Sequence, residues 1–219
     1  SEFLPAVEGG DLTERLGEVM LFHALTALTE WDRKGLRVPN VSVNFSAADL
    51  RNARLPDRLK WELDGLVLTP DRLTVEILET VIAASENDMV VANIAALAAM
   101  GCGIDLDDFG TGHASITTIR RFAVRRLKID RSFVTRVDQD REQQKLVSAI
   151  VSLAERLGLE TLAEGVETAS EHAMLSQLGC GHVQGYGLAR PMPMEEASDW
   201  ILRHMQRQDR IPRIGARSR

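Results

Sequence analysis

The stretch Ile104-Asp105-Leu106-Asp107-Asp108-Phe109-Gly110-Thr111-Gly112, residues 104–112, predicts a strand that ends in a polar loop. Ile104 and Leu106 alternate with Asp105, and a strand of period two therefore reaches its end at the paired carboxylates. Hard divalent cations take several oxygen ligands and need a backbone that can adjust around them. Two adjacent carboxylates followed by a glycine loop offer both. The stretch thus predicts a strand with a cation site at its C-terminal end.

The same unit recurs along the chain: an alternating strand, a polar residue at its end, a loop and a helix that ends at glycine. The predicted strands lie at about residues 41–46, 73–78, 104–107, 127–129 and 161–163 and around Val183. Helices with apolar residues at three- and four-residue spacing are predicted at about residues 12–34, 86–100, 140–157 and 168–178. They end at Gly35, Gly101, Gly158 and Gly179. Strands that alternate with helices predict a parallel sheet.

Two folds fit this alternation, a closed (β/α) barrel and an open doubly wound sheet. Polar residues follow many successive strands, which favours the barrel, because only a closed sheet brings all the C-terminal strand ends to one mouth. A TIM-type barrel has eight strand-helix units, and only about six are counted here. We therefore expect an α/β fold of the TIM-type barrel kind, with the first one or two strand-helix units missing from these residues.

Composition narrows the possible partners. The 219 residues carry a formal net charge of −6, which argues against nucleic acid or an anionic membrane as a partner. Cys102 and Cys180 form no disulfide pattern. No apolar run approaches the length of a membrane span, and the N-terminus lacks the basic and apolar blocks of a signal peptide. We expect one domain over residues 1–202 and a basic, partly disordered tail over residues 203–219. The expected location is the cytoplasm. The domain could also be the cytoplasmic part of a larger, membrane-anchored protein.

The residues at the predicted strand ends form a set of acidic and amide oxygens with one ammonium group: Asn44, Glu76, Asp107, Asp108, Lys128, Asp130, Glu164, Glu167 and Gln184. Without a set of His or Cys ligands, this inventory suits one or two Mg²⁺ or Mn²⁺ ions rather than zinc. Two such ions can clamp a phosphodiester during an in-line displacement. Lys128 would oppose charge on phosphate oxygens, and Glu164 could orient or deprotonate water. The inventory favours hydrolysis of a phosphate ester.

Several motifs in a fixed order resemble the EAL domain, a family of bacterial phosphodiesterases for cyclic di-GMP. They are Glu2-Phe3-Leu4-Pro5, Asn44, Glu76-Ile77-Leu78-Glu79, the stretch 107–112, Lys128-Ile129-Asp130, Glu164-Gly165-Val166-Glu167, Gln184-Gly185-Tyr186 and Arg190-Pro191-Met192-Pro193. The resemblance implies a modified TIM barrel that depends on Mg²⁺ or Mn²⁺ and opens cyclic di-GMP to linear pGpG. It also implies a homodimer through the loop after Asp108 and a possible upstream sensory or cyclase domain.

The resemblance also assigns roles by position. The metal ligands would be Asn44, Glu76 and Asp107, with Asp108 at the second metal. Lys128 and Glu164 would handle the attacking water. The supporting positions near metals and substrate would be Asp130 and Gln184, with Glu167 lining the site, and Glu79 would hold the loop after the paired aspartates.

Some positions depart from the family pattern. The Glu-Ala-Leu tripeptide that names the family, whose glutamate is a metal ligand, occurs nowhere in these residues. We therefore expect the chain to be truncated before that motif, or to be a degenerate domain, and to have weakened metal binding and low activity by itself. Leu78 replaces a usual threonine and His113 a usual aromatic residue. The alternatives to an enzyme are a receptor that binds cyclic di-GMP without cleaving it and a scaffold for protein contacts.

Overall fold

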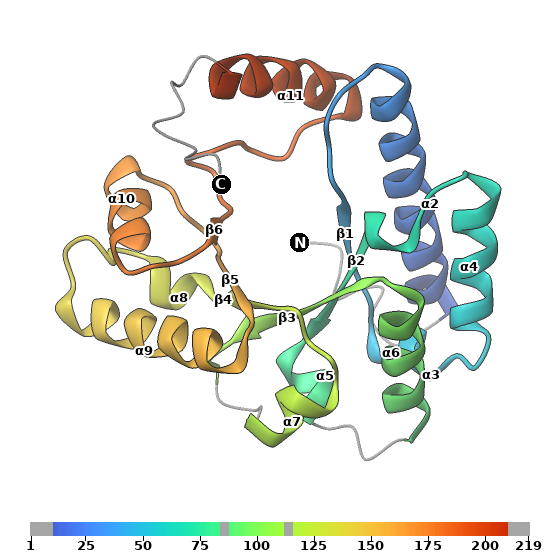
Figure 1. Ribbon diagram of the computed structural model, residues 1–219, viewed down its shortest axis with the longest axis horizontal. Coiled ribbons are helices and arrows are strands. Elements are labelled where there is room, and N and C mark those ends of the chain that lie inside the picture. Colours follow the sequence, from blue (N-terminus) through green and yellow to red (C-terminus); the bar gives the residue numbers. More distant parts are fainter. Residues whose placement is uncertain (1–10, 84–87, 112–115, 210–219) are drawn as a thin grey trace, which may run out of the picture.

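A computed structural model describes residues 11–83, 88–111 and 116–209, and its strands form one parallel sheet in sequence order. The strands are β1 (Val41–Asn44), β2 (Leu73–Leu78), β3 (Gly103–Phe109), β4 (Arg126–Ile129), β5 (Glu160–Ala163) and β6 (His182–Val183). Each strand pairs in parallel with the next. Figure 1 shows the strands around a central axis with the helices outside them. The predicted α/β fold of the barrel kind is confirmed, with six strands in the described residues.

Helices connect successive strands and cover the outside of the sheet (Figure 1). They are α2 (Asp11–Arg33), α3 (Ala47–Arg51), α4 (Leu55–Gly65), α5 (Glu79–Ala83), α6 (Asp88–Met100), α7 (Ile116–Arg121), α8 (Arg131–Val134), α9 (Arg141–Leu157), α10 (Ala169–Gln177) and α11 (Met194–Asp209), with a short 3-10 helix at Pro70–Arg72. The four helices predicted from the apolar spacing are confirmed as α2, α6, α9 and α10. The shortest helices were not predicted because one turn or two carry too little periodicity, and the longer helices α4 and α11 were missed as well.

Local chemistry explains where the helices begin and end, as α9 illustrates. The side chain of Asp140 accepts hydrogen bonds from the backbone N–H groups of Glu142 and Gln143 at the start of the helix. Gly158 ends it with φ of 72°, a left-handed conformation that suits a residue without Cβ. The interpretation of Gly158 as a C-cap is thus confirmed.

Side chains on the two faces of β2 lie in different environments. On β2, Val75 and Ile77 are fully buried in the hydrophobic core between the sheet and its helices. The residue between them, Glu76, points to the opposite face, because side chains alternate along a strand. Glu76 pairs in register with Asn44 on β1 and with Asp105 on β3. The polar strand ends therefore lie side by side at one end of the sheet.

Helix α11 follows β6 in the chain and contacts α2. The indole Nε1 of Trp31 and the Nζ of Lys34 donate to the Oγ of Ser198, at 3.1 Å and 3.3 Å. The domain boundary expected at residue 202 falls inside α11, which continues to Asp209. The rest of the expected tail lies outside the described residues.

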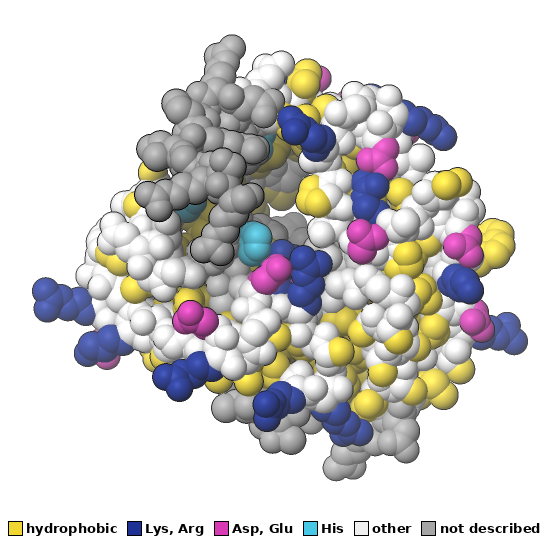
Figure 2. Space-filling model, in the orientation of Figure 1, with side chains coloured by type: hydrophobic (Ala, Val, Ile, Leu, Met, Phe, Trp, Pro, Cys, Tyr) yellow, Lys and Arg dark blue, Asp and Glu magenta, His cyan; other side chains and the backbone are white. Residues whose placement is uncertain are grey.

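Two surface properties bear on the expected partners. On the face drawn in Figure 2, the described Lys and Arg side chains are dispersed and do not merge into one basic patch. No helix within the described ranges is both long and apolar enough to cross a membrane.

Candidate active site

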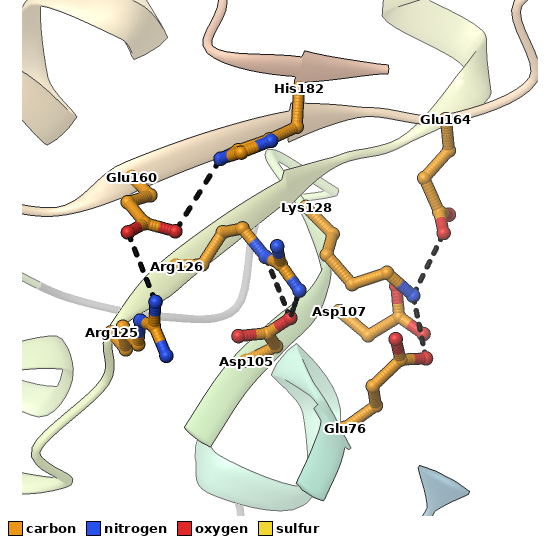
Figure 3. Close-up of polar contacts among 9 residues, drawn as sticks. All are labelled: Glu76, Asp105, Asp107, Arg125, Arg126, Lys128, Glu160, Glu164 and His182. Atoms are coloured by element: carbon orange, nitrogen blue, oxygen red, sulfur yellow. Dashed lines mark hydrogen bonds and ion pairs between the residues drawn. The ribbon is translucent and has the colours of Figure 1, made fainter. Parts of the chain in front are cut away.

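Four charged side chains from neighbouring strands meet at the C-terminal end of the sheet. The Nζ of Lys128 lies 2.8 Å from Glu76 Oε2, 2.9 Å from Asp107 Oδ1 and 2.8 Å from Glu164 Oε1. The Lys128 side chain is only 3% exposed, so these carboxylates replace water as its partners. Figure 3 shows Lys128 pointing between the three acidic groups. The structure thus brings together four of the predicted site residues.

The cluster is unevenly charged, since three carboxylates share one ammonium group. Burial by itself lowers the pKa of Lys128, but the charges of Glu76 and Asp107 and the hydrogen bonds to Glu164 and Glu76 outweigh it and raise that pKa. Burial is also the main reason why the pKa of Glu164 is raised, with the neighbouring carboxylates adding to it and Lys128 opposing it. Lys128 therefore remains charged. Burial and the excess negative charge together make Glu164 easier to protonate.

Asp108 adds a further carboxylate beside this cluster. Oxygen atoms of Asp107, Asp108 and Glu164 all lie within 4.8 Å of one another, close enough to share one metal ion. Asp108 has φ of 54°, which is unusual for a residue with a side chain, and its N–H donates to Asp107 Oδ1 at 3.0 Å. Burial and the nearby charges of Asp107 and Asp130 raise the pKa of Asp108. Oxygen donors with excess negative charge fit Mg²⁺ or Mn²⁺.

Glu79 fixes the loop that follows the paired aspartates. It begins α5, is 2% exposed, and its Oε2 accepts a hydrogen bond from the backbone N–H of Gly110 at 3.0 Å. The contact places Glu79 against the loop that it is predicted to stabilise. Gly112 and His113 lie outside the described residues.

The structure does not bring the remaining predicted site residues into the group of ion pairs around Lys128. Asp130 begins α8, and its Oδ1 accepts from the N–H of Ser132 at 3.0 Å. Although burial opposes it, the hydrogen bonds from Ser132 and Arg131 lower the pKa of Asp130, which stays charged near Asp108. Asn44, Glu167 and Gln184 are exposed residues at the ends of β1, β5 and β6.

Two features of the site were not predicted. Asp105 and Arg126 form an ion pair within the strands, in which Arg126 Nε donates to Asp105 Oδ2 at 2.8 Å. Each lies two residues before a predicted site residue, so the alternation of the strands was the available signal. Buried Glu171 is the second, because it accepts hydrogen bonds from the N–H groups of Arg136, Glu167 and Thr168. The Thr168-x-x-Glu171 spacing of a capping box could have indicated it.

A sequence profile of the EAL domain matches residues 1–191, most of the chain. The chain belongs to the EAL domain family. The predicted resemblance is therefore confirmed, and the cluster around Lys128 is the polar end of an EAL domain.

The curated relatives of this EAL domain include a cyclic di-GMP enzyme and an oxygen sensor. It is 38% identical over 195 residues to MucR of Pseudomonas aeruginosa, a bifunctional diguanylate cyclase and cyclic di-GMP phosphodiesterase, covering 89% of this chain and 28% of MucR. It is 34% identical over 206 residues to the oxygen sensor protein DosP of Escherichia coli K12, covering 92% of this chain and 25% of DosP. The chain thus spans only about a quarter of the length of these relatives.

A solved structure agrees with the fold. The PaMucR phosphodiesterase, in complex with c-di-GMP, is 38% identical and superimposes with a TM-score of 0.83, covering 90% of this chain and 79% of that one. The EAL barrel architecture is therefore shared beyond the motifs of the site.

Proposed function

We propose that this EAL domain hydrolyses one phosphodiester bond of cyclic di-GMP and releases linear pGpG, with Mg²⁺ or Mn²⁺ as its cofactor. The observation that carries the proposal is the buried convergence of Lys128, Glu76, Asp107 and Glu164 at the C-terminal strand ends. The name of MucR and the c-di-GMP complex of PaMucR support the choice of substrate. Activity of this kind would lower cyclic di-GMP signalling.

The residues that would hold the metal are the ones whose oxygens already converge. Asp107 and Asp108 offer two such oxygens, and Glu76 adds a third carboxylate through the shared contact with Lys128. Asn44 lies next to Glu76 in the strand register. When bound, Mg²⁺ or Mn²⁺ supplies positive charge to the phosphate oxygens and makes water more acidic.

Two protein side chains would supply the base and the positive charge that the reaction needs. Glu164 is the proposed base: it is the most exposed of the three carboxylates around Lys128, at 20%, so water can reach it. Lys128 holds Glu164 in place through the 2.8 Å contact and keeps its own proton, because its pKa is raised. Its charge then opposes the charge that develops on the phosphate.

Glu164→Gln tests the assignment of the base. The variant keeps the shape of the side chain and loses the group that accepts a proton, so we expect turnover to fall by about 10²-fold or more. Cyclic di-GMP binding should be retained. Chromatography of cyclic di-GMP and pGpG, with Mg²⁺, with Mn²⁺ and with EDTA, measures turnover. Unchanged hydrolysis by the variant would show that Glu164 is not the base.

A receptor that binds cyclic di-GMP without cleaving it is the second candidate. Calorimetry with cyclic di-GMP separates the two candidates: tight binding without pGpG formation supports the receptor, whereas turnover supports the enzyme. The absence of any binding heat would remove both.

The same family membership leads to two proposals about partners. We propose a homodimer through the loop after Asp108, part of which lies outside the described residues. An upstream sensory or cyclase module is proposed because MucR is bifunctional, DosP is an oxygen sensor, and both are much longer than this chain. A cytoplasmic location fits a substrate made inside the cell.

A further inference from the structure

A second ion pair lies inside the barrel, one layer below the cluster around Lys128. Arg126 donates to Asp105 Oδ2 through both Nε, at 2.8 Å, and Nη2. The Asp105 side chain is 1% exposed and that of Arg126 is 15% exposed, so the pair is largely shielded from water. Figure 3 shows this pair beside Lys128, Asp107 and Glu76.

The strand register places Asp105 between two groups of opposite charge. Asp105 pairs with Glu76 on one side and with Arg126 on the other. All three side chains share the inner face, because Asp105 precedes Asp107 by two residues and Arg126 precedes Lys128 by two. Two strand spacings separate the backbones of Glu76 and Arg126 by about 10 Å, a gap that a glutamate and an arginine side chain can bridge together.

We propose that Asp105 is a positioning residue that holds the guanidinium of Arg126 away from Glu76. Glu76 then remains available to Lys128 and to a metal ion. Without Asp105, the unpaired guanidinium would have two carboxylates along this level of the sheet. Glu160, its register partner on β5, already contacts Arg125, whereas Glu76 on the other side is buried and a bidentate contact with it would be strong. The inference rests on the proposed function, since it treats Glu76 as part of the metal site.

This role predicts that loss of Asp105 and loss of Arg126 change the affinity for a metal ion in opposite directions. Loss of Asp105 leaves a positive charge that competes for Glu76 and repels a cation. Loss of Arg126 leaves Asp105 without its partner, which destabilises the fold but adds negative charge near the metal site. If the pair only stabilised the barrel, both variants would change the metal affinity in the same direction.

The test is Mn²⁺ titration by calorimetry on protein stripped with EDTA. Asp105→Ala should weaken Mn²⁺ binding about tenfold, Arg126→Met should bind at least as tightly as the wild type, and the double variant should return close to the wild-type affinity. Equal weakening in both single variants, or a double variant no better than Asp105→Ala, would overturn the proposal. If Asp105→Ala does not fold, Asp105→Asn should show a smaller loss in the same direction, and no loss there would overturn the proposal.

Arg125, just before β4, and Glu160, at the start of β5, provide a matched control pair. Their contact is 3.3 Å, and both side chains are about half exposed, at 53% and 42%. Glu160→Ala also removes a carboxylate from an arginine and changes the net charge by the same amount as Asp105→Ala, and it should leave the Mn²⁺ affinity unchanged. A loss as large as that of Asp105→Ala would show that net charge alone accounts for the effect.

A second measurement separates this inference from the proposed function. In a crystal structure of metal-free Asp105→Ala, we expect the Arg126 guanidinium to contact the Glu76 carboxylate. If the wild-type protein binds no Mn²⁺, the proposed metal site is wrong. The presence or absence of the Arg126–Glu76 contact in the variant would still test whether Asp105 positions Arg126. Arg126 directed away from Glu76 in the variant would overturn it.

Discussion

Lys128 is the residue on which the site depends. A buried ammonium is costly unless it is paired, and here three carboxylates surround it within 2.9 Å. The same contacts keep the carboxylates from repelling one another in the metal-free protein. Lys128 therefore organises the site before any metal binds, and its raised pKa keeps it charged at all physiological pH values.

Lys128→Met tests this role. It removes the shared cation and leaves buried carboxylates without a partner, so the free energy of unfolding of the metal-free protein should fall by about 3–5 kcal/mol. Mg²⁺ should recover more stability in the variant than in the wild type, because it replaces the missing positive charge. Urea unfolding with EDTA and with Mg²⁺ measures both effects. An equal response to Mg²⁺ in the two proteins would contradict the argument.

At the scale of elements, short helices hold the loops that carry the site. The N-terminus of α5 supplies Glu79, which binds Gly110, and α8 packs Phe133 against the same glycine. A Cβ on Gly110 would lie 2.8 Å from Phe133 Cε2, and the residue has φ of 105°. The loop after β3 is therefore confined by both backbone conformation and packing.

Gly110→Ala measures that confinement. We expect a loss of about 3 kcal/mol of stability, combining left-handed strain with the collision against Phe133. Gly158→Ala is the matched control, because Gly158 also has a positive φ but nothing lies within 4 Å of its Cβ position. It should cost about 1 kcal/mol. Denaturant unfolding of both variants compares them, and equal losses would rule out the collision.

Glu171 holds the loop between β5 and α10, and its effect should depend on pH. Although burial opposes it, hydrogen bonds from Arg136, Glu167 and Thr168 lower the pKa of Glu171 below 4.5. The charged form thus stabilises the fold above pH 4.5, and this contribution is lost as the pH falls through the lowered pKa.

Glu171→Gln should accordingly cost about 1–3 kcal/mol at pH 7, since an amide cannot accept all of these hydrogen bonds. The difference from the wild type should shrink as the pH falls below 4.5, because Glu171 then becomes protonated. Urea unfolding at several pH values checks this. A difference that stays constant down to pH 3 would mean that the charge of Glu171 does not matter.

For the whole molecule, α11 links the last strand to the first described helix. Ser198 is 8% exposed and accepts hydrogen bonds from Trp31 and Lys34 of α2 and its C-terminal end, while its own hydroxyl donates to Met194 O. These contacts join segments more than 160 residues apart. Strands β1 and β6 are not neighbours in the sheet, so α11 supplies contacts across that gap.

Ser198→Ala leaves the indole N–H of Trp31 without its acceptor. We expect a loss of about 1 kcal/mol in the free energy of unfolding. Ser152→Ala, an exposed position on α9, should change it by less than about 0.5 kcal/mol. Thermal and urea unfolding compare the two variants, and equal changes would show that the contact with α2 contributes nothing.

The sequence predicted the alternation of strands and helices along the chain, the parallel sheet and the position of polar residues at strand ends. Each depends on local periodicity: two along a strand and about 3.6 along a helix. This is why Glu76, Asp107, Lys128 and Glu164 could be placed at one end of a barrel. The motifs also led to the EAL domain family, which the profile match confirms.

Only the tertiary structure decided which of these charges touch. Strand register sets Glu76 beside Asp105 and Asp105 beside Arg126, and no local pattern contains that register. Distances between side chains on different strands depend on pairing and on sheet curvature, which are properties of the folded chain. The sequence by itself therefore determined where the site lies, while the fold determined that Lys128 lies between three carboxylates and that Asp105 lies between Glu76 and Arg126.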